Sequence, residues 1–155
     1  MYPFIAKPSY ITVNYNGFGV TLHFRTFPAY GANKAPRLNW AGAPKDMVSF
    51  VCIVDDPDAL TKEPFVHWLV YNIPAEVHTL DNPSVGKTGK NSYANIDYDC
   101  PKPPAGKVHH YHFKLYALNT EFSFNQPPTK TELLAAMQPH IIVFKEIISL
   151  YYKTI

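Results

Sequence analysis

Carboxylate and imidazole side chains stand at the ends of two apolar stretches of this sequence. The run from Val48 to Val54 ends in Asp55-Asp56-Pro57-Asp58, which places three carboxylates around a proline, and the next apolar run opens with His67. If the two runs are neighbouring buried strands, their polar ends meet at one end of a sheet. This arrangement predicts a small polar pocket at the rim of a β structure.

A third segment adds two candidate binding residues. In the stretch His109–Leu118, alternate residues form a mainly apolar row that we expect to face the core, and His109 and Tyr111 begin that row. Imidazoles and phenols donate hydrogen bonds to an oxyanion, and nearby carboxylates keep imidazoles partly protonated. The candidates from this pattern are Asp56, Asp58, His67, His109 and Tyr111.

The same residues also permit a structural interpretation, which spacing alone favours. Asp56 can begin an Asx turn at the Asp-Pro step, and His67 and His109 can be hydrogen-bonded core residues. In a functional interpretation, Asp56 would repel an anion directly. Its role would then be to orient a histidine or to accept a hydrogen bond from a ligand amine.

A metal-dependent hydrolase that uses the same pocket is the alternative function. His110 and His112 project from one strand face, and Cys100, Asp58 or His67 could complete a set of metal ligands. The sequence lacks HExxH spacing and paired cysteines, and it contains no G-x-S-x-G nucleophile motif. We therefore expect no catalytic residue, no metal and no cofactor.

Composition indicates one folded, β-rich domain over residues 1–155. Hydrophobic residues make up 46% of the chain and charged residues 17%, which is typical of a globular protein. The 21 Tyr and Phe residues favour strands, and 15 prolines indicate many rigid loops. The net charge is +2 and the basic residues are scattered, so the chain lacks the basic stripe of a nucleic-acid-binding protein.

The remaining elements are expected to flank this central β structure. Ile11–Phe24 reads as a hairpin that turns near Asn16-Gly17, and Leu38–Trp40 reads as a short strand within a loop. The segment Glu76–Ala105 is mostly irregular, as functional loops often are. Thr129 and Glu132 have capping-box spacing at the start of a helix that Pro139 ends. Phe144–Tyr152 is expected to finish as a strand.

Cysteine usage and hydropathy give an expected location. Cys52 lies in an apolar run and should be buried, whereas Cys100 lies in a proline-rich loop and could be exposed. A disulfide between them is permitted but is not the expectation. The N-terminal residues show no signal-peptide pattern, and no apolar segment is long enough for a membrane span. We expect a cytoplasmic protein, or a periplasmic one if a leader has been removed.

Several segments, in order along the chain, resemble boxes of one protein family. Asp56-Pro57-Asp58-Ala59 resembles the DPDA(P) box of phosphatidylethanolamine-binding proteins, also called Raf kinase inhibitor-like proteins. His67-Trp68 before VYNIP and the stretch Cys100–Leu118 resemble two further boxes of the bacterial branch. Ala35–Pro44 and the closing helix are weaker matches. The resemblance spans nearly the whole chain.

The resemblance implies a two-sheet antiparallel β-sandwich with Greek-key links and a small C-terminal helical element. It also implies a non-enzymatic protein whose pocket accepts phosphate-like groups or phospholipid head groups. Some family members regulate kinases or inhibit proteases. Independently of the resemblance, an exposed edge strand and the proline-rich loops permit a homodimer. The implied ligand-binding residues are Asp56, Asp58, His67, His109 and Tyr111, with Pro103 and Pro104 forming one lip.

The chain departs from the family pattern at three places. Leu60 replaces the proline that closes the DPDAP box, and His110 replaces the arginine of the HRY motif. Asp97-Tyr98-Asp99 occupies the approach to Cys100, where Gly-Pro is usual. Losing the arginine removes a permanent, forked cation, and Asp99 adds negative charge near the pocket. Both changes are expected to weaken anion binding unless His110 is protonated.

Overall fold

The computed structural model describes residues 3–5, 10–15, 17–23, 35–81, 85–100, 102, 104 and 106–153. In 3–5, 10–15, 23 and 151–153 only the backbone is described. The strands are β1 (Pro3–Ile5), β2 (Tyr10–Tyr15), β3 (Phe18–His23), β4 (Arg37–Ala41), β5 (Ser49–Asp56), β6 (Phe65–Pro74), β7 (Thr79–Leu80), β8 (Lys87–Thr88), β9 (Val108–Leu118) and β10 (Ile141–Lys153). The helix α1 spans Lys130–Met137 and is followed by the short 3₁₀ helix η1, Gln138–His140.

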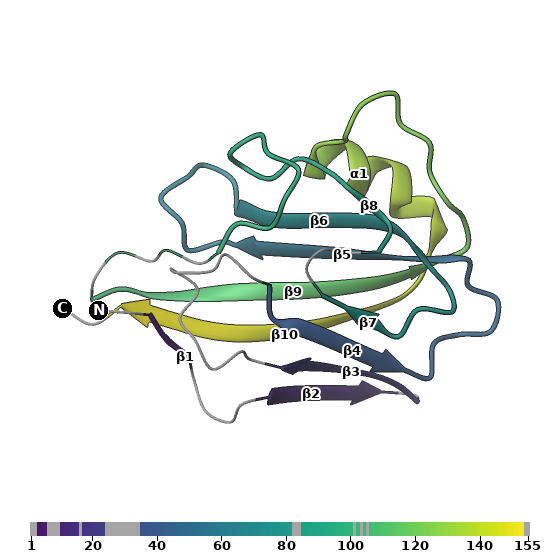
Figure 1. Ribbon diagram of the computed structural model, residues 1–155, viewed down its shortest axis with the longest axis horizontal. Helices are drawn as coiled ribbons and strands as arrows, with labels where there is room; N and C mark the ends of the chain where they lie inside the picture. Colours follow the sequence, from purple (N-terminus) through teal and green to yellow (C-terminus); the bar gives the residue numbers. More distant parts are fainter. Residues whose placement is uncertain are drawn as a thin grey trace.

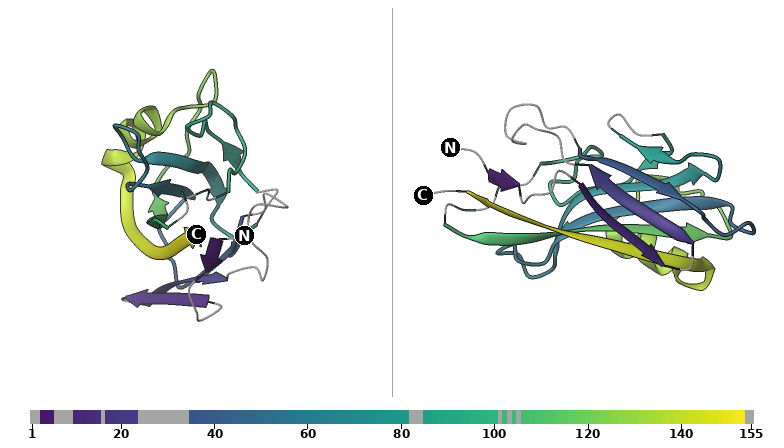
Figure 2. Two further views of the ribbon diagram at one scale, coloured as in Figure 1. Left: turned by 90° about the vertical axis from the view of Figure 1, so that its left-hand side faces the viewer. Right: turned by 90° about the horizontal axis from the view of Figure 1, so that it is seen from below.

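The described strands form two antiparallel sheets (Figure 1). The large sheet has the order β1-β10-β9-β5-β6-β8, and the small sheet has the order β2-β3-β4-β7. The small sheet packs on one face of the large sheet, and α1 lies on the other side (Figure 2). The predicted β-sandwich with a small C-terminal helical element is therefore confirmed.

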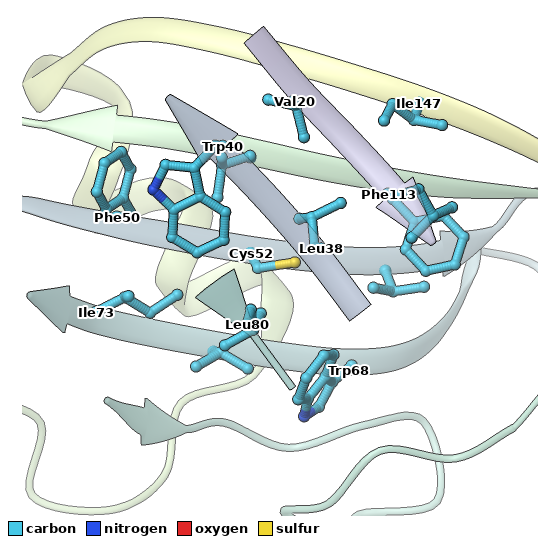
Figure 3. Packing of buried hydrophobic residues seen from close by; sticks show 14 of the residues in the cluster. Val20, Leu38, Trp40, Phe50, Cys52, Trp68, Ile73, Leu80, Phe113 and Ile147 are labelled. Carbon is cyan, nitrogen blue, oxygen red and sulfur yellow. The ribbon is translucent and has the colours of Figure 1, made fainter. Parts of the chain in front are cut away.

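The main core lies between the two sheets (Figure 3). Side chains from both inner faces interdigitate there, as the alternation of side chains along each strand requires. Examples are Val20, Leu38, Trp40, Phe50, Cys52, Trp68, Ile73, Leu80, Phe113 and Ile147. A second cluster joins α1 to the opposite face of the large sheet through Leu133 and Met137, which pack with Ile53 and Leu69.

The two apolar runs form the centre of the large sheet. All eight residues of β5 are buried, because one face meets the small sheet and the other meets the α1 cluster. β5 pairs with β6 on one side and with β9 on the other. The predicted pairing of the two buried strands is confirmed, and β9 shows the predicted alternation of buried and outward residues.

The flanking elements agree with the sequence patterns with small shifts in their bounds. β2 and β3 pair as the predicted hairpin, with Tyr15 opposite Phe18; Asn16 and Phe24 lie outside the described residues. Thr129 caps α1 in a full capping box with Glu132, and the α-helix ends before Pro139. β10 is a strand as predicted, but it begins three residues earlier, at Ile141.

Cys100 differs from the expectation that its loop exposes it. Its exposed fraction is 3%, because the loop folds back and inserts the thiol into the core between the sheets. Cys52 is buried as predicted, and both cysteines are free thiols. Sequence composition marks proline-rich segments as loops, but it does not show which of their side chains point inward.

No helix among the described residues is long and apolar enough to cross a membrane.

Candidate functional site

Three strand ends meet at one end of the large sheet, toward the left in Figure 1. β5 ends at Asp56, opposite Phe65 at the start of β6, and β9 begins beside them at Val108. A cavity of about 240 Å³ opens there. Its lining comprises Asp56, Ala59, Leu60, Thr61, Phe65, His67, Tyr93, Asp99, Cys100, Lys102, Pro104, His109 and Tyr111.

Asp56 holds the imidazole of His109. His109 Nδ1 lies 2.6 Å from Asp56 Oδ2, and both side chains are almost fully buried. The second carboxylate oxygen, Oδ1, accepts the backbone N–H of Asp58 and forms the predicted Asx turn. With Asp56 ionised, Nδ1 of His109 carries the proton, so a neutral ring presents Nε2 as a hydrogen-bond acceptor.

His67 is held by the backbone of the loop that faces it. Its Nδ1 donates to the carbonyl oxygen of Asp99 at 2.7 Å, since a carbonyl can only accept. The backbone N–H of Asp99 donates in return to the carbonyl of His67. His67 is 5% exposed, and burial lowers the pKa of its imidazole. The ring is therefore neutral at pH 7, with its proton on Nδ1.

His67 Nε2 is a buried polar atom that has no hydrogen-bond partner among the described residues. A buried acceptor without a donor costs free energy, so such atoms are rare in folded proteins. A ligand that enters the cavity and donates a hydrogen bond removes this cost. This atom distinguishes His67 from a fully satisfied structural histidine.

Aromatic rings form the walls around the two imidazoles. The ring centroid of Tyr111 lies 5.0 Å from that of His67 and 6.4 Å from that of His109. The ring centroid of Phe65 lies 4.9 Å from that of His67 and 4.9 Å from that of Tyr93. These contacts fix the imidazole planes and leave an apolar surface beside the polar floor.

The loop that contains Cys100 supplies the charged wall. Lys102 Nζ lies 3.3 Å from Asp99 Oδ1 and 5.8 Å from the ring centroid of Tyr93. Asp99 Oδ2 is buried and, within the described part of the chain, has no partner. Burial raises the pKa of the Cys100 thiol, so this thiol is protonated and poorly nucleophilic at pH 7.

The structure brings most, but not all, of the predicted site residues together. Asp56, His67, His109, Tyr111 and Pro104 line the same cavity. Pro103 lies outside the described residues.

Asp58 is not in the cavity lining and instead faces outward. Its Oδ2 accepts from the backbone N–H of His110 at 2.7 Å and from Nδ1 of His110 at 2.6 Å. These hydrogen bonds lower the pKa of the Asp58 carboxyl group. The predicted orientation of a pocket histidine by Asp58 is thus replaced by a contact with His110 on the outward row of β9.

Sequence reasoning missed the residues that complete the cavity walls, among them Phe65, Tyr93 and Lys102. The only signal for Tyr93 and Lys102 was the long irregular segment Glu76–Ala105, which we expected to be functional as a whole. Phe65 begins β6, where an aromatic residue is ordinary.

The comparison with known proteins identifies the family. Residues 12–152 match the family model described as phosphatidylethanolamine-binding protein. The chain belongs to the phosphatidylethanolamine-binding protein family. A UPF0098 protein of Pyrococcus abyssi is 39% identical over 133 residues, which cover 79% of this chain and 74% of that protein.

Two solved structures of phosphatidylethanolamine-binding protein homologues share the fold. One, from Chlamydia trachomatis, is 34% identical, with a TM-score of 0.75, and the match covers 79% of this chain and 84% of the other. The other is YbcL of Escherichia coli, at 31% identity and a TM-score of 0.73, covering 81% of this chain and 83% of the other. The predicted family and fold are both confirmed.

The departures from the phosphatidylethanolamine-binding protein pattern fall around the cavity. Leu60 is 96% exposed and belongs to the cavity lining. His110 pairs with Asp58 outside the lining. Asp99 contributes both its carbonyl, which holds His67, and its carboxylate, which lies in the charged wall.

The alternative of a metal-dependent hydrolase has no support in this arrangement. Across the described ranges, no group of three or more His, Cys, Asp and Glu side chains is placed to hold a metal ion. His112 lies 3.1 Å from Glu146 on the outer face of the sheet, whereas Cys100 belongs to the core on the other face. Of the donors proposed for one metal site, Asp58, His110 and His112 lie on the outer side, whereas His67 and Cys100 lie at the cavity, so the set as a whole does not converge on one point.

Proposed function

We propose that the cavity binds a small phosphate-bearing molecule, such as free phosphate or a phospholipid head group, and catalyses no reaction. The observation that carries this proposal is the unpartnered Nε2 of buried His67, in a cavity whose other imidazole, His109, is fixed by Asp56. Hydrogen bonds at Nδ1 fix the rings of His67 and His109, so the Nε2 atom of each ring points away from the protein group that holds the ring.

Proton uptake accompanies anion binding in this proposal. Neutral imidazoles with the proton on Nδ1 have only a lone pair on Nε2, which repels a bare oxyanion. An anion therefore brings its own proton, as a monoanionic phosphate does, or each imidazole that contacts it becomes protonated. The second possibility requires the pKa of His67 to rise from its lowered value when the ligand binds.

The charged wall favours a ligand that also donates hydrogen bonds. Asp99 Oδ2 is a second buried acceptor for which the described residues provide no donor. The ammonium group of an ethanolamine head group supplies such a donor. A phosphate linked to an ammonium thus matches both the imidazoles and the carboxylate.

Titration of phosphorylethanolamine, followed by calorimetry, tests the proposal. His109→Gln should weaken binding about tenfold or more, because a hydrogen bond to a charged group is lost. His78→Gln is the matched control, since His78 is exposed and outside the cavity lining. Absence of binding to the wild-type protein, or equal losses in both variants, would contradict the proposal.

A regulatory role towards a kinase or a protease is a second candidate. It is favoured by two exposed apolar side chains in the lining, Leu60 at 96% and Tyr93 at 54% exposure. A protein partner that covers these side chains would close the cavity. Competition between such a partner and phosphorylethanolamine would support this role.

A further inference from the structure

A second cavity lies between the start of α1 and the start of β6. Its volume is about 420 Å³, which is larger than that of the cavity around His67. The two cavities share no lining residue. We call the second one the α1 cavity and the first one the His67 cavity. A volume of this size is typical of small-molecule binding sites.

Two segments of the chain form the wall between the cavities, and neighbouring residues of each segment line different cavities. Val66 lines the α1 cavity, whereas Phe65 before it lines the His67 cavity. Tyr93 likewise lines the His67 cavity, between Ser92 and Ala94 of the α1 cavity. Ser92 Oγ accepts the backbone N–H of Val66 at 2.7 Å, and the N–H of Ser92 donates to the carbonyl of Val66 at 2.9 Å. The α1 cavity is therefore a separate site behind a hydrogen-bonded wall.

Buried Asn91 holds one side of the α1 cavity in a fixed conformation. Its Oδ1 accepts the backbone N–H groups of Tyr93 and Asn95 at 2.9 and 3.1 Å. Its Nδ2 donates to the carbonyl of Asp97 at 2.8 Å. Within this loop Ala94 has a φ of 62°, in the left-handed region that a non-glycine residue rarely adopts. A wall that is already ordered lowers the cost of binding a ligand.

Two opposite charges in the lining of the α1 cavity are available to a ligand. Glu63 and Lys90 form hydrogen bonds through their backbone atoms, and within the described part of the chain neither side-chain charge has a partner. Lys130, the other cation of the lining, is bound to the buried carboxylate of Asp55 at 2.6 Å. A molecule that carries both an ammonium and a carboxylate group can pair with Glu63 and Lys90 at once.

The remaining lining suits a peptide with an apolar side chain. Pro64, Val66 and Leu134 provide apolar surface, and the hydroxyl groups of Ser92 and Thr131 can form hydrogen bonds with a peptide group. A volume of 420 Å³ corresponds to about 14 water molecules at roughly 30 Å³ each. A dipeptide such as alanyl-leucine has a similar number of non-hydrogen atoms.

We propose that the α1 cavity binds a short zwitterionic peptide of the size of a dipeptide. Lys90 pairs with the carboxylate of the peptide, and Glu63 pairs with its ammonium group. The apolar side chain of the peptide contacts Val66 and Leu134. This site does not depend on the function proposed for the His67 cavity.

Calorimetric titration of the full chain with alanyl-leucine, its C-terminal amide and its N-acetyl derivative tests both charge contacts. We expect a dissociation constant of about 1 mM or lower for alanyl-leucine. Each derivative lacks one charge and should bind at least about fivefold more weakly. Lys90→Gln should remove only the preference over the amide, and Glu63→Gln only the preference over the N-acetyl derivative. Lys45→Gln and Glu76→Gln, at exposed positions outside the lining, should keep both preferences.

NMR spectra locate the bound peptide. The backbone amide signals of Ser92 and Thr131 should shift on titration with alanyl-leucine, whereas those of His109 and Tyr111 in the His67 cavity should not. Absence of binding at about 10 mM alanyl-leucine overturns the proposal. So does equal binding of the three ligands, or a set of signal shifts confined to the His67 cavity.

Discussion

The two nitrogens of His67 face different surroundings, and this difference underlies the proposed function. Nδ1 donates to the carbonyl of Asp99, whereas Nε2 is buried without a partner among the described residues. The carbonyl fixes the tautomer, and burial keeps the ring neutral. A buried acceptor without a partner costs free energy of folding, and a hydrogen bond donated by a bound ligand would offset that cost.

The titration of His67 can be measured by NMR of its imidazole. We expect a pKa below the ordinary value of about 6.5 in the free protein, and a rise on addition of ethanesulfonate. The unfolded chain binds a proton to this ring below about pH 6.5 and the folded chain does not, so stability falls as the pH drops below that value. His67→Gln should show a smaller fall. A free-protein pKa at or above 6.5 would contradict this account.

Two neighbouring aspartates provide a matched pair of variants. Asp56→Asn removes the carboxylate that holds His109, so affinity for phosphorylethanolamine should fall about tenfold. Asp58→Asn changes a group that contacts His110 outside the cavity lining, so affinity should change less than about twofold. Calorimetric titration of both variants measures this. An equal loss in both would show that Asp58 also contributes to binding.

Predictability from sequence differs among the site residues. The alternation of side chains along β9 correctly predicted that His109 and Tyr111 lie on its buried face, because the backbone of a strand directs successive side chains to opposite faces of the sheet. This alternation does not apply in the turn after β5, so it could not predict that Asp58 lies outside the cavity lining. Tyr93 and Lys102 depend on how a loop folds over the sheet, which no local pattern encodes.

At the scale of elements, Asp55 connects the helix to the centre of the large sheet. Its Oδ2 accepts from Lys114 of β9 at 3.0 Å and from Lys130 of α1 at 2.6 Å, and Asp55 is 1% exposed. Because side chains alternate along β5, Asp55 points towards α1 and Asp56 towards the cavity. The two adjacent carboxylates thus form their contacts on opposite faces of the sheet.

Asp55→Asn should destabilise the fold and detach the first turn of α1. Removing one member of a buried ion-pair network leaves the two lysines without compensation, so we expect a loss of about 3 kcal/mol in the free energy of unfolding. Asp58→Asn, at an exposed pair, should cost less than about 1 kcal/mol. Urea denaturation, monitored by circular dichroism, measures the free energy of unfolding of both variants. Equal stabilities of the two variants would contradict the role assigned to Asp55.

Elements with local signals could be predicted, whereas those set by distant contacts could not. The capping residues Thr129 and Glu132 fixed the start of α1, and Pro139 fixed its end. The burial of Cys100 depends instead on the loop folding onto the core between the sheets. The start of β10 at Ile141 likewise depends on its pairing with Leu118 of β9.

At the scale of the whole molecule, the cavity exists because β6, β5 and β9 are adjacent in the large sheet. β5 and β6 are consecutive in the sequence, but the pairing of β5 with β9 does not follow from sequence order, because more than 50 residues separate the end of β5 from the start of β9. The strand pattern made His67 and His109 candidates for one site, with a structural interpretation favoured by spacing alone, and the family resemblance then implied that both line the same pocket. The antiparallel registers bring their strand ends to the same edge.

The affinity of ethanesulfonate measured from about pH 8 to about pH 5.5 tests the central claim most directly. This ligand keeps one negative charge throughout that range, so only protein groups titrate. If the imidazoles must take up protons to bind an anion, affinity should rise about tenfold or more as the pH falls, and His67→Gln should reduce that rise. An affinity that stays constant over this range would contradict the account.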